Sequence, residues 1–265
     1  MSDTDYVLGT HAAELERLGL QHRVWRSVVL EAWHRAGLTS GQRVLDIGAG
    51  PGYATADLAE IVGAKGKVVA LERSPQFVDA IRARGLVNVE AHELDLMEKE
   101  WPGADYDFAW CRWVAAFVID PTALIAKLAS ALRTRGVAVF HEYGYYETWQ
   151  FLPPDRAHEE FRRQVVKAWR ASGGEPDVGA ELPALLAQHG FAARSVRPHV
   201  FCIQPTDEMW QWPATFVDVY APRLKEENAL DDSFVENVRT AFRNAEAEQR
   251  WMMTPLVLEI IAEKG

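Results

Sequence analysis

A glycine-rich turn carries the clearest chemical signal in this sequence. A short apolar run at 43–47 leads into Gly-Ala-Gly-Pro-Gly at 48–52, and apolar residues at helical spacing follow. Glycines at a strand-to-helix turn let the backbone turn tightly and approach a ligand closely. Asp46 lies two residues before the first glycine, where its carboxylate suits a cationic ligand better than a pyrophosphate. The turn therefore predicts a ligand site, although a purely structural turn would use the same glycines.

Two acidic residues follow where a nucleoside would need them. Glu72 ends the next predicted strand, about 20 residues after Gly50, and could accept hydrogen bonds from both ribose hydroxyls. Asp95 follows the third predicted strand, where it could accept from the exocyclic amine of adenine while Leu96 packs on the ring. A single acidic residue at a strand end is usually only solvated. The combination with the glycine turn is what makes Glu72 informative.

The predicted elements place these residues at one edge of a parallel sheet. Short apolar runs alternate with helical segments, and the strands are predicted at 43–47, 68–71, 87–91, 107–110 and 136–140. This alternation implies right-handed crossovers and a parallel sheet. A long helix is predicted before the first strand. Beyond Phe140 the pattern is less regular, with helices predicted at 161–170, 182–189 and 233–248 and strands at 191–203 and 256–261.

In this order along the chain, Asp46-x-Gly48-x-Gly50-x-Gly52, Glu72 and Asp95 resemble the class I S-adenosylmethionine-dependent methyltransferases over about residues 41–143. The opening Tyr6-Val-Leu-Gly9, followed by Glu14, Glu16 and Gln21, is similar to small-molecule members related to the ubiquinone/menaquinone methyltransferases. The resemblance implies a Rossmann-like α/β three-layer sandwich with a mostly parallel seven-stranded sheet, its last strand antiparallel and inserted next to the fifth. It also implies S-adenosyl-L-methionine as cofactor and S-adenosyl-L-homocysteine as product.

The resemblance further implies a set of cofactor-binding residues. They are Tyr6, Asp46, Gly48, Ala49, Gly50, Gly52, Glu72, Arg73, Asp95, Leu96, Arg112 and Trp113. Tyr6 is a candidate contact to the cofactor carboxylate, and the backbone of the glycine turn wraps the methionine portion. Arg112 and Trp113 match positions that line the cofactor in similar proteins, although Arg112 could instead form a surface salt bridge.

Catalysis requires an acceptor atom aligned about 3 Å from the methyl carbon, and much of the acceleration can come from positioning. Oxygen or carbon acceptors usually also lose a proton. The end of the fifth predicted strand supplies His141-Glu-Tyr143, and His141 is the candidate general base because its ordinary pKa is near 6.5. Alternation along a strand places His141 and Tyr143 on one side and Glu142 on the other. A structural role remains open for His141, and Tyr143 could bind substrate or pack the lid.

The remaining segments predict how an acceptor is enclosed. We expect a helical entry segment at 1–40 and a methyltransferase domain at 41–265, with lid insertions at about 144–180 and 205–250. Seven of the ten tryptophans lie outside 41–140, at positions 25, 33, 149, 169, 210, 212 and 251. Aromatic side chains beside a cleft can shape an apolar pocket, so a small, partly apolar metabolite is the expected substrate. The alternative is that these tryptophans only pack the added helices.

Composition narrows the partners. The chain has 28 basic and 38 acidic residues, a net charge of −10, and no long basic run, so nucleic acid is not an expected partner. Its apolar runs are too short to span a membrane. The polar opening Met-Ser-Asp-Thr-Asp shows no signal peptide, and the two cysteines match no metal spacing. We expect a cytoplasmic protein without a metal, and the oligomeric state stays open.

Two other functions compete with methyl transfer. A protein of this fold could bind the cofactor for structure or regulation without transferring a methyl group, since fold does not fix function. A nicotinamide-dependent reductase is the third possibility. Tyr53 at the sixth position of the glycine pattern, and the lack of a Tyr-x-x-x-Lys pair, argue against a reductase.

Overall fold

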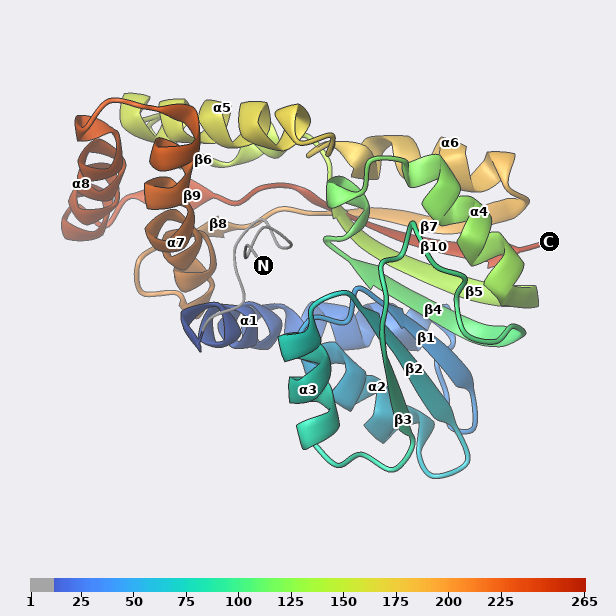
Figure 1. Cartoon of the computed structure of the whole chain (residues 1–265). Coiled ribbons are helices and arrows are strands. Elements are labelled where there is room, and N and C mark those ends of the chain that lie inside the picture. Colours follow the sequence, from blue (N-terminus) through green and yellow to red (C-terminus); the bar gives the residue numbers. More distant parts are fainter. Residues whose placement is uncertain (1–11) are drawn as a thin grey trace.

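The computed structural model describes residues 12–265, and its central feature is one seven-stranded sheet (Figure 1). In sheet order the strands are β3 (Val89–Glu93), β2 (Lys67–Glu72), β1 (Arg43–Ile47), β4 (Tyr106–Arg112), β5 (Leu132–Tyr143), β10 (Val257–Lys264) and β7 (Phe191–His199). The first five are parallel, whereas β10 is antiparallel to both of its neighbours. This arrangement confirms the predicted fold class and the predicted place of the last strand.

Helices cover both faces of this sheet and give it three layers. One face carries α1 (Ala12–Ala36) and α2 (Tyr53–Val62), and the other carries α4 (Pro121–Ala131) and α6 (Val178–Gln188) (Figure 1). The remaining helix of this part, α3 (Pro75–Ala83), packs along β2 and β3. Val44 belongs to the core beneath α1 and α2, whereas its neighbour Leu45 belongs to the core beneath α4 and α6. Because side chains alternate along a strand, a strand that is buried along nearly its whole length, as β1 is, has cover on both sides.

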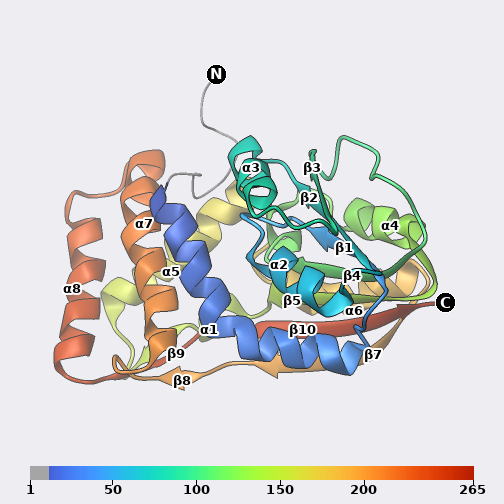
Figure 2. The same ribbon diagram turned by 90° about the horizontal axis from the view of Figure 1, so that it is seen from below.

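A second group of elements, here called the cap, lies at one end of the main sheet beside the first half of α1 (Figures 1 and 2). The cap consists of α5 (Arg156–Ala171), α7 (Gln211–Asn228), α8 (Ser233–Ala247) and a small sheet with the order β6 (Gln150–Leu152), β9 (Trp251–Met253) and β8 (Cys202–Ile203). Its three helices lie inside the segments predicted as lid insertions. The small sheet is not predicted by the sequence, because strands of two or three residues are too short to show a period.

Several boundaries differ from the sequence-based predictions. Strand β5 extends beyond the predicted range 136–140 at both ends and continues to Tyr143, so His141 pairs with neighbouring strands on both sides. The segment 191–203, for which the sequence predicts either a strand pair or one long strand, forms β7 and β8, which belong to different sheets. Three short 3-10 turns complete the chain: η1 (Ala115–Phe117), η2 (Tyr146–Thr148) and η3 (Glu208–Trp210).

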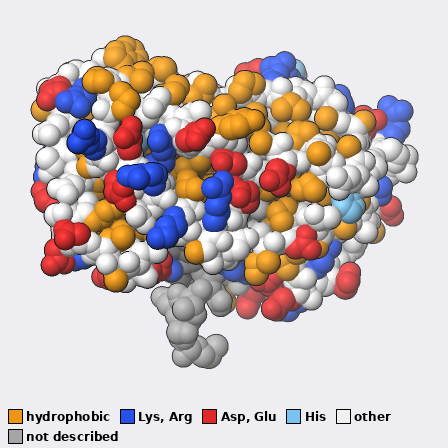
Figure 3. Space-filling view, turned by 90° about the horizontal axis from the view of Figure 1, so that it is seen from above, with side chains coloured by type: hydrophobic (Ala, Val, Ile, Leu, Met, Phe, Trp, Pro, Cys, Tyr) orange, Lys and Arg blue, Asp and Glu red, His pale blue; other side chains and the backbone are white. Residues whose placement is uncertain are grey.

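The surface is charged but mixed in sign. On the face shown in Figure 3, lysine and arginine side chains are interspersed with aspartate and glutamate rather than gathered into one basic region. No helix within residues 12–265 is both long and apolar enough to cross a bilayer.

Candidate functional site

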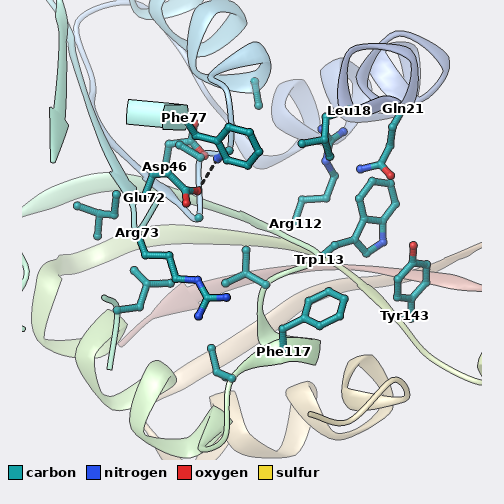
Figure 4. A pocket seen from close by; sticks show the side chains of 18 of the residues that line it. Leu18, Gln21, Asp46, Glu72, Arg73, Phe77, Arg112, Trp113, Phe117 and Tyr143 are labelled. Atoms are coloured by element: carbon teal, nitrogen blue, oxygen red, sulfur yellow. Dashed lines mark hydrogen bonds between the residues drawn. The ribbon is translucent and has the colours of Figure 1, made fainter. Parts of the chain in front are cut away.

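A large cavity opens at the carboxyl ends of β1, β2, β4 and β5, between the main sheet and the cap (Figure 4). Its volume of about 500 Å³ lies within the range of small-molecule sites. The glycine turn, Glu72 and Asp95 line one part, and aromatic residues from β5 and the cap line the other. The cavity therefore has a polar half and an aromatic half.

The glycine turn forms the floor of the polar half. Gly48 and Gly52 have φ angles of 66° and 79°, and a Cβ on either would collide with a side chain, Val114 at 2.3 Å or Ile81 at 2.7 Å. Gly50 has a φ of 55°, yet an added Cβ would meet no atom within 4 Å. Packing thus requires the two outer glycines, while the middle one leaves the backbone open to a ligand. Gly52 itself does not line the cavity.

Glu72, at the end of β2, points its carboxylate toward the turn (Figure 4). One oxygen accepts a hydrogen bond from the backbone N–H of Gly50 at 2.8 Å, and the other accepts from Ser74 N–H at 2.8 Å. Burial raises the pKa of Glu72, and these backbone donors oppose that rise. Each carboxylate oxygen has a second lone pair, so the group retains acceptor capacity for hydroxyl donors on a ligand.

Three more predicted residues complete the polar half. The buried carboxylate of Asp46 accepts a hydrogen bond from the Thr55 hydroxyl at 2.6 Å, and burial raises its pKa to about 6. Asp95 accepts from the backbone N–H of Met97 at 2.8 Å. Arg73 extends its guanidinium toward the space between the two halves (Figure 4). Ala49 and Leu96 also line the cavity.

Arg112 places a positive charge between the two halves of the cavity. Its guanidinium lies 5.0 Å from the ring centre of Trp113, and Nη2 lies 3.4 Å from Nδ1 of His22. Nη1 is buried and has no hydrogen-bond partner in the described part of the chain. Burial lowers the pKa of Arg112 to about 10, which still leaves it charged at neutral pH. A buried donor of this kind suits an anionic group on a ligand. Arg112 therefore does not form the surface salt bridge that was the alternative prediction.

Trp113 is held in an unusual backbone conformation beside Arg112. Its φ of 51° falls in the left-handed region, which costs a non-glycine residue about 1–3 kcal/mol and is frequent at ligand sites. Backbone N–H groups on both sides anchor the segment, because Trp113 donates to the carbonyl of His141 at 2.9 Å and Val114 donates to the carboxylate of Glu142 at 2.8 Å. No function is predicted for Glu142 from the sequence. The one feature that could have pointed to it is a lone carboxylate in the apolar end of a predicted strand.

Aromatic rings from η1, β5, η2, α5 and α7, and from the loops beside them, form the second half of the cavity. Trp113 stacks on Tyr143 and on Trp212, with both pairs of ring centres 5.5 Å apart. Further rings that line this half are Phe117, Tyr146, Trp149, Trp169 and Phe216. Three of the tryptophans outside 41–140 therefore shape the pocket, and the others do not: Trp25, Trp33 and Trp210 are buried in the core, and Trp251 is exposed.

His141 lies outside the cavity. Its ring is fully buried between Trp25 and Trp110, and burial lowers its pKa to about 4. Alternation along β5 does place His141 and Tyr143 on the same side, as predicted. However, α1 covers the sheet at His141, so only Tyr143 reaches the cavity. This geometry does not support His141 as a general base, and the structural alternative describes its position.

Helix α1 contributes a buried ion pair that is not predicted from the sequence. Arg17 binds both carboxylate oxygens of Glu14, at 2.7 and 2.6 Å, and donates to the side chain of Gln21 at 3.2 Å. Arg17 and Gln21 line the cavity. A Glu–Arg pair three residues apart is common on exposed helix faces, so its spacing alone carries no sign of burial. Tyr6, the other candidate in this segment, lies outside the described residues.

Comparison with known proteins finds several methyltransferases among the relatives of this chain. A methyltransferase domain family matches residues 44–136. An aklanonic acid methyltransferase from Streptomyces sp. (strain C5) is 30% identical over 121 residues, which cover 44% of this chain and 55% of that protein. A demethylmenaquinone methyltransferase from Geobacillus stearothermophilus is 25% identical over 201 residues, covering 68% of this chain and 82% of that protein.

A solved structure shows the same fold over most of the chain. The S-adenosylmethionine-dependent methyltransferase from Mesorhizobium loti superimposes with a TM-score of 0.51 at 24% identity, covering 85% of this chain and 92% of that one. This chain matches only about half the length of the first curated relatives.

Proposed function

This chain is 46% identical over 183 residues, 67% of each protein, to a ubiquinone/menaquinone biosynthesis C-methyltransferase from Photorhabdus laumondii, and so belongs to the class I S-adenosylmethionine-dependent methyltransferases. We propose that it transfers the methyl group of S-adenosylmethionine to a small, partly apolar metabolite. The observation that carries the proposal is the continuity of the cavity. A polar cradle suited to a nucleoside and an aromatic compartment suited to an apolar acceptor open into each other. A protein that only stored the cofactor would have no need of the second compartment.

The residues of the polar half fit the cofactor. In our proposal Glu72 accepts from the ribose hydroxyls, Asp95 and Leu96 hold the adenine, and the backbone at 48–50 follows the methionine portion. The unpartnered Nη1 of Arg112 would bind the anionic end of the cofactor. When bound, the cofactor supplies a methyl group on a positively charged sulfur, and the carboxylate of Asp46 lies in the wall of the same cavity.

The aromatic half would orient the acceptor and exclude water. Stacked rings contact a planar or apolar acceptor over a large area while leaving it little freedom, and such positioning accounts for much of the acceleration in bimolecular transfer. Tyr143 is our candidate for direct contact with the acceptor, since its ring ends β5 beside Trp113. We propose that the first half of α1 and the cap act as a lid over this half.

The lid can be tested by hydrogen exchange. Lids are usually less stable locally than the sheet beneath them. Amides of α5, α7 and the first half of α1 should exchange faster in the free protein than those of β1 and β5. Addition of S-adenosylhomocysteine with an acceptor should slow them. Equal protection of cap and sheet without ligand would contradict a mobile lid.

Cofactor binding is tested by calorimetric titration with S-adenosylhomocysteine. We expect micromolar affinity, about −8 kcal/mol. Glu72→Gln should weaken it by about 1.5–3 kcal/mol, roughly 10- to 150-fold, because a charged acceptor is lost. Glu93→Gln is the matched control, since Glu93 is the exposed register partner of Glu72 on β3. Equal affinity of wild type and Glu72→Gln would remove Glu72 from the site, and no binding by folded wild type would refute the cofactor assignment.

Methyl transfer itself needs a separate measurement. Incubation with S-adenosylmethionine and the small-molecule fraction of a cell extract should produce S-adenosylhomocysteine faster than either component alone. Tight cofactor binding without extract-dependent turnover would instead favour the non-methylating alternative. We also propose a cytoplasmic protein without a nucleic-acid partner, on the basis of its acidic net charge and the mixed surface in Figure 3.

A further inference from the structure

Three potential metal ligands converge behind the wall of the cavity. His141 on β5, His199 on β7 and Glu259 on β10 come from three adjacent strands, and β10 is the middle one. The Nε2 atom of His199 lies 3.0 Å from Oε2 of Glu259, and Nε2 of His141 lies 3.5 Å from the same oxygen. All three ligand atoms lie within 4.8 Å of one another.

These separations are close to the ligand spacing of a zinc ion. Nitrogen and oxygen ligands at about 2.0–2.2 Å from tetrahedral zinc are about 3.3–3.6 Å apart, because the angle between them is close to 109°. The His141–Glu259 separation of 3.5 Å lies in this range, the His199–Glu259 separation of 3.0 Å lies below it, and the two imidazole nitrogens are within 4.8 Å of each other, so small side-chain shifts would complete the site. Two imidazoles and one carboxylate also form a ligand set that zinc uses in proteins, with a fourth position left to water.

His141 supplies a second, independent observation. Its side chain is fully buried, and neither ring nitrogen has a hydrogen-bond partner in the described part of the chain. The 3.5 Å separation from Glu259 is too poorly aligned to satisfy Nε2. Buried polar atoms without partners are uncommon in folded proteins and call for an explanation. A cation bound at Nε2 would provide one.

The surroundings orient the carboxylate for this purpose. Arg35 on α1 donates to Oε1 of Glu259, so the other oxygen faces the two imidazoles. Arg35 also pairs with Glu31, which lies 3.9 Å from Arg197, so the two carboxylates and two guanidiniums of this group balance in charge. Metal-binding carboxylates are commonly held by such an outer hydrogen bond. His199 is 19% exposed, which gives an ion a route from solvent.

We propose that His141, His199 and Glu259 bind one zinc ion through Nε2, Nε2 and Oε2. The ion would join β5, β7 and β10 behind the cavity, and its role would be structural. It would support the cavity wall through the backbone, since the carbonyl of His141 accepts from Trp113 N–H. This site is separate from the cofactor cradle, so neither proposal depends on the other. It also revises the expectation of no metal.

The test uses untagged full-length protein stripped of metal with a chelator. Calorimetric titration with zinc should show one equivalent bound, and titration with cobalt(II) should give the visible absorption of a low-coordinate nitrogen-ligated ion. His199→Gln should weaken zinc binding at least tenfold. His189→Gln, at the partly exposed end of α6, is the control and should bind as wild type does. Circular dichroism verifies that each variant is folded.

A second measurement needs no variant. Long-range proton–nitrogen NMR of the imidazoles should show the Nε2 signals of His141 and His199 shifting together on addition of one equivalent of zinc. The proposal is overturned if wild type binds no zinc at micromolar concentration. It is also overturned if His199→Gln binds as tightly as wild type, or if the shifting signals belong to other histidines.

Discussion

The two halves of the cavity are built in different ways. The polar half comes mainly from residues 46–52, 72 and 95, within one stretch of about fifty residues, and its groups are held by hydrogen bonds to neighbouring backbone. The aromatic half draws on α1, η1, β5, α5 and α7, and its groups are held by ring contacts. The methyltransferase family match covers residues 44–136, so it includes the polar half but, of the rings in the aromatic half, only Trp113 and Phe117.

This contrast separates what the chain shares with its family from what is its own. Cofactor binding needs a few polar groups at fixed offsets around one turn, and a short motif can specify them. Acceptor binding needs a shaped apolar surface, which many combinations of side chains can supply. We therefore propose that the acceptor specificity of this protein depends on the cap. Changes to one half of the cavity at a time can test this proposal.

Gly48→Ala should cause the largest loss, because it damages the polar half from within. The new methyl group would meet Val114 at 2.3 Å, and the residue would keep a φ of 66°. Strain and overpacking together should lower the free energy of unfolding by about 2–6 kcal/mol. Gly41→Ala is the control, since it has a φ of 86° but nothing within 4 Å. Denaturant unfolding should show a clearly smaller loss for the control, and equal losses would rule out the contact with Val114 as the cause.

His158→Leu should remove part of the pH dependence of the free energy of unfolding, a part that arises in the cap. His158 is buried among Trp149, Phe151 and Phe242, and burial lowers its pKa to about 3. The unfolded chain therefore binds more protons between about pH 3 and 6.5, so the free energy of unfolding falls as the pH falls through this window. The contribution should be about 3 kcal/mol between pH 7 and pH 4.

Unfolding of the His158→Leu variant should accordingly depend less steeply on pH than that of wild type. Phe161→Leu changes the same buried helix face without removing a titratable group, and it should keep the wild-type slope. If His158→Leu and wild type show parallel pH profiles, burial does not hold this imidazole neutral.

Trp212→Phe should weaken binding of the acceptor in the aromatic half while leaving cofactor binding in the polar half nearly unchanged. The smaller ring loses part of its stack on Trp113 and the hydrogen bond from Nε1 to Gln21, which together should cost about 1 kcal/mol of acceptor binding. The KM for the acceptor should rise about fivefold, while the affinity for S-adenosylhomocysteine stays within twofold. The exposed Trp251, changed to Phe, should alter neither. A larger loss of cofactor affinity than of acceptor affinity would show that the halves are not separable.

Asp95→Ala should produce a small effect, comparable to that of Trp212→Phe but on the cofactor side alone. One acceptor for an amine is lost, and the N–H of Met97 loses its partner in a half-buried turn where water can replace it. The affinity for S-adenosylhomocysteine should fall by about 0.5–1.5 kcal/mol, or 2- to 12-fold, in calorimetry. Unchanged affinity would mean that the adenine lies elsewhere.

Local patterns along the chain determined the polar half and most of the main sheet. The glycine turn, the strand ending at Glu72 and the alternation around β5 are set by residues close in sequence, so their periods and spacings can be read before folding. Tyr6, one of the residues assigned to the cofactor by resemblance, lies outside the described part of the chain. Of the others, all but Gly52 line the cavity.

Only the tertiary structure decided which side chains are exposed to the cavity and which are sealed. Alternation assigns His141 and Tyr143 to one side of β5, but the path of α1 covers the first and leaves the second open. Likewise, Glu259 meets His141 and His199 only because β10 inserts between β5 and β7. Such contacts join residues more than fifty positions apart, and no short-range period encodes them, since they depend on the packing of whole elements.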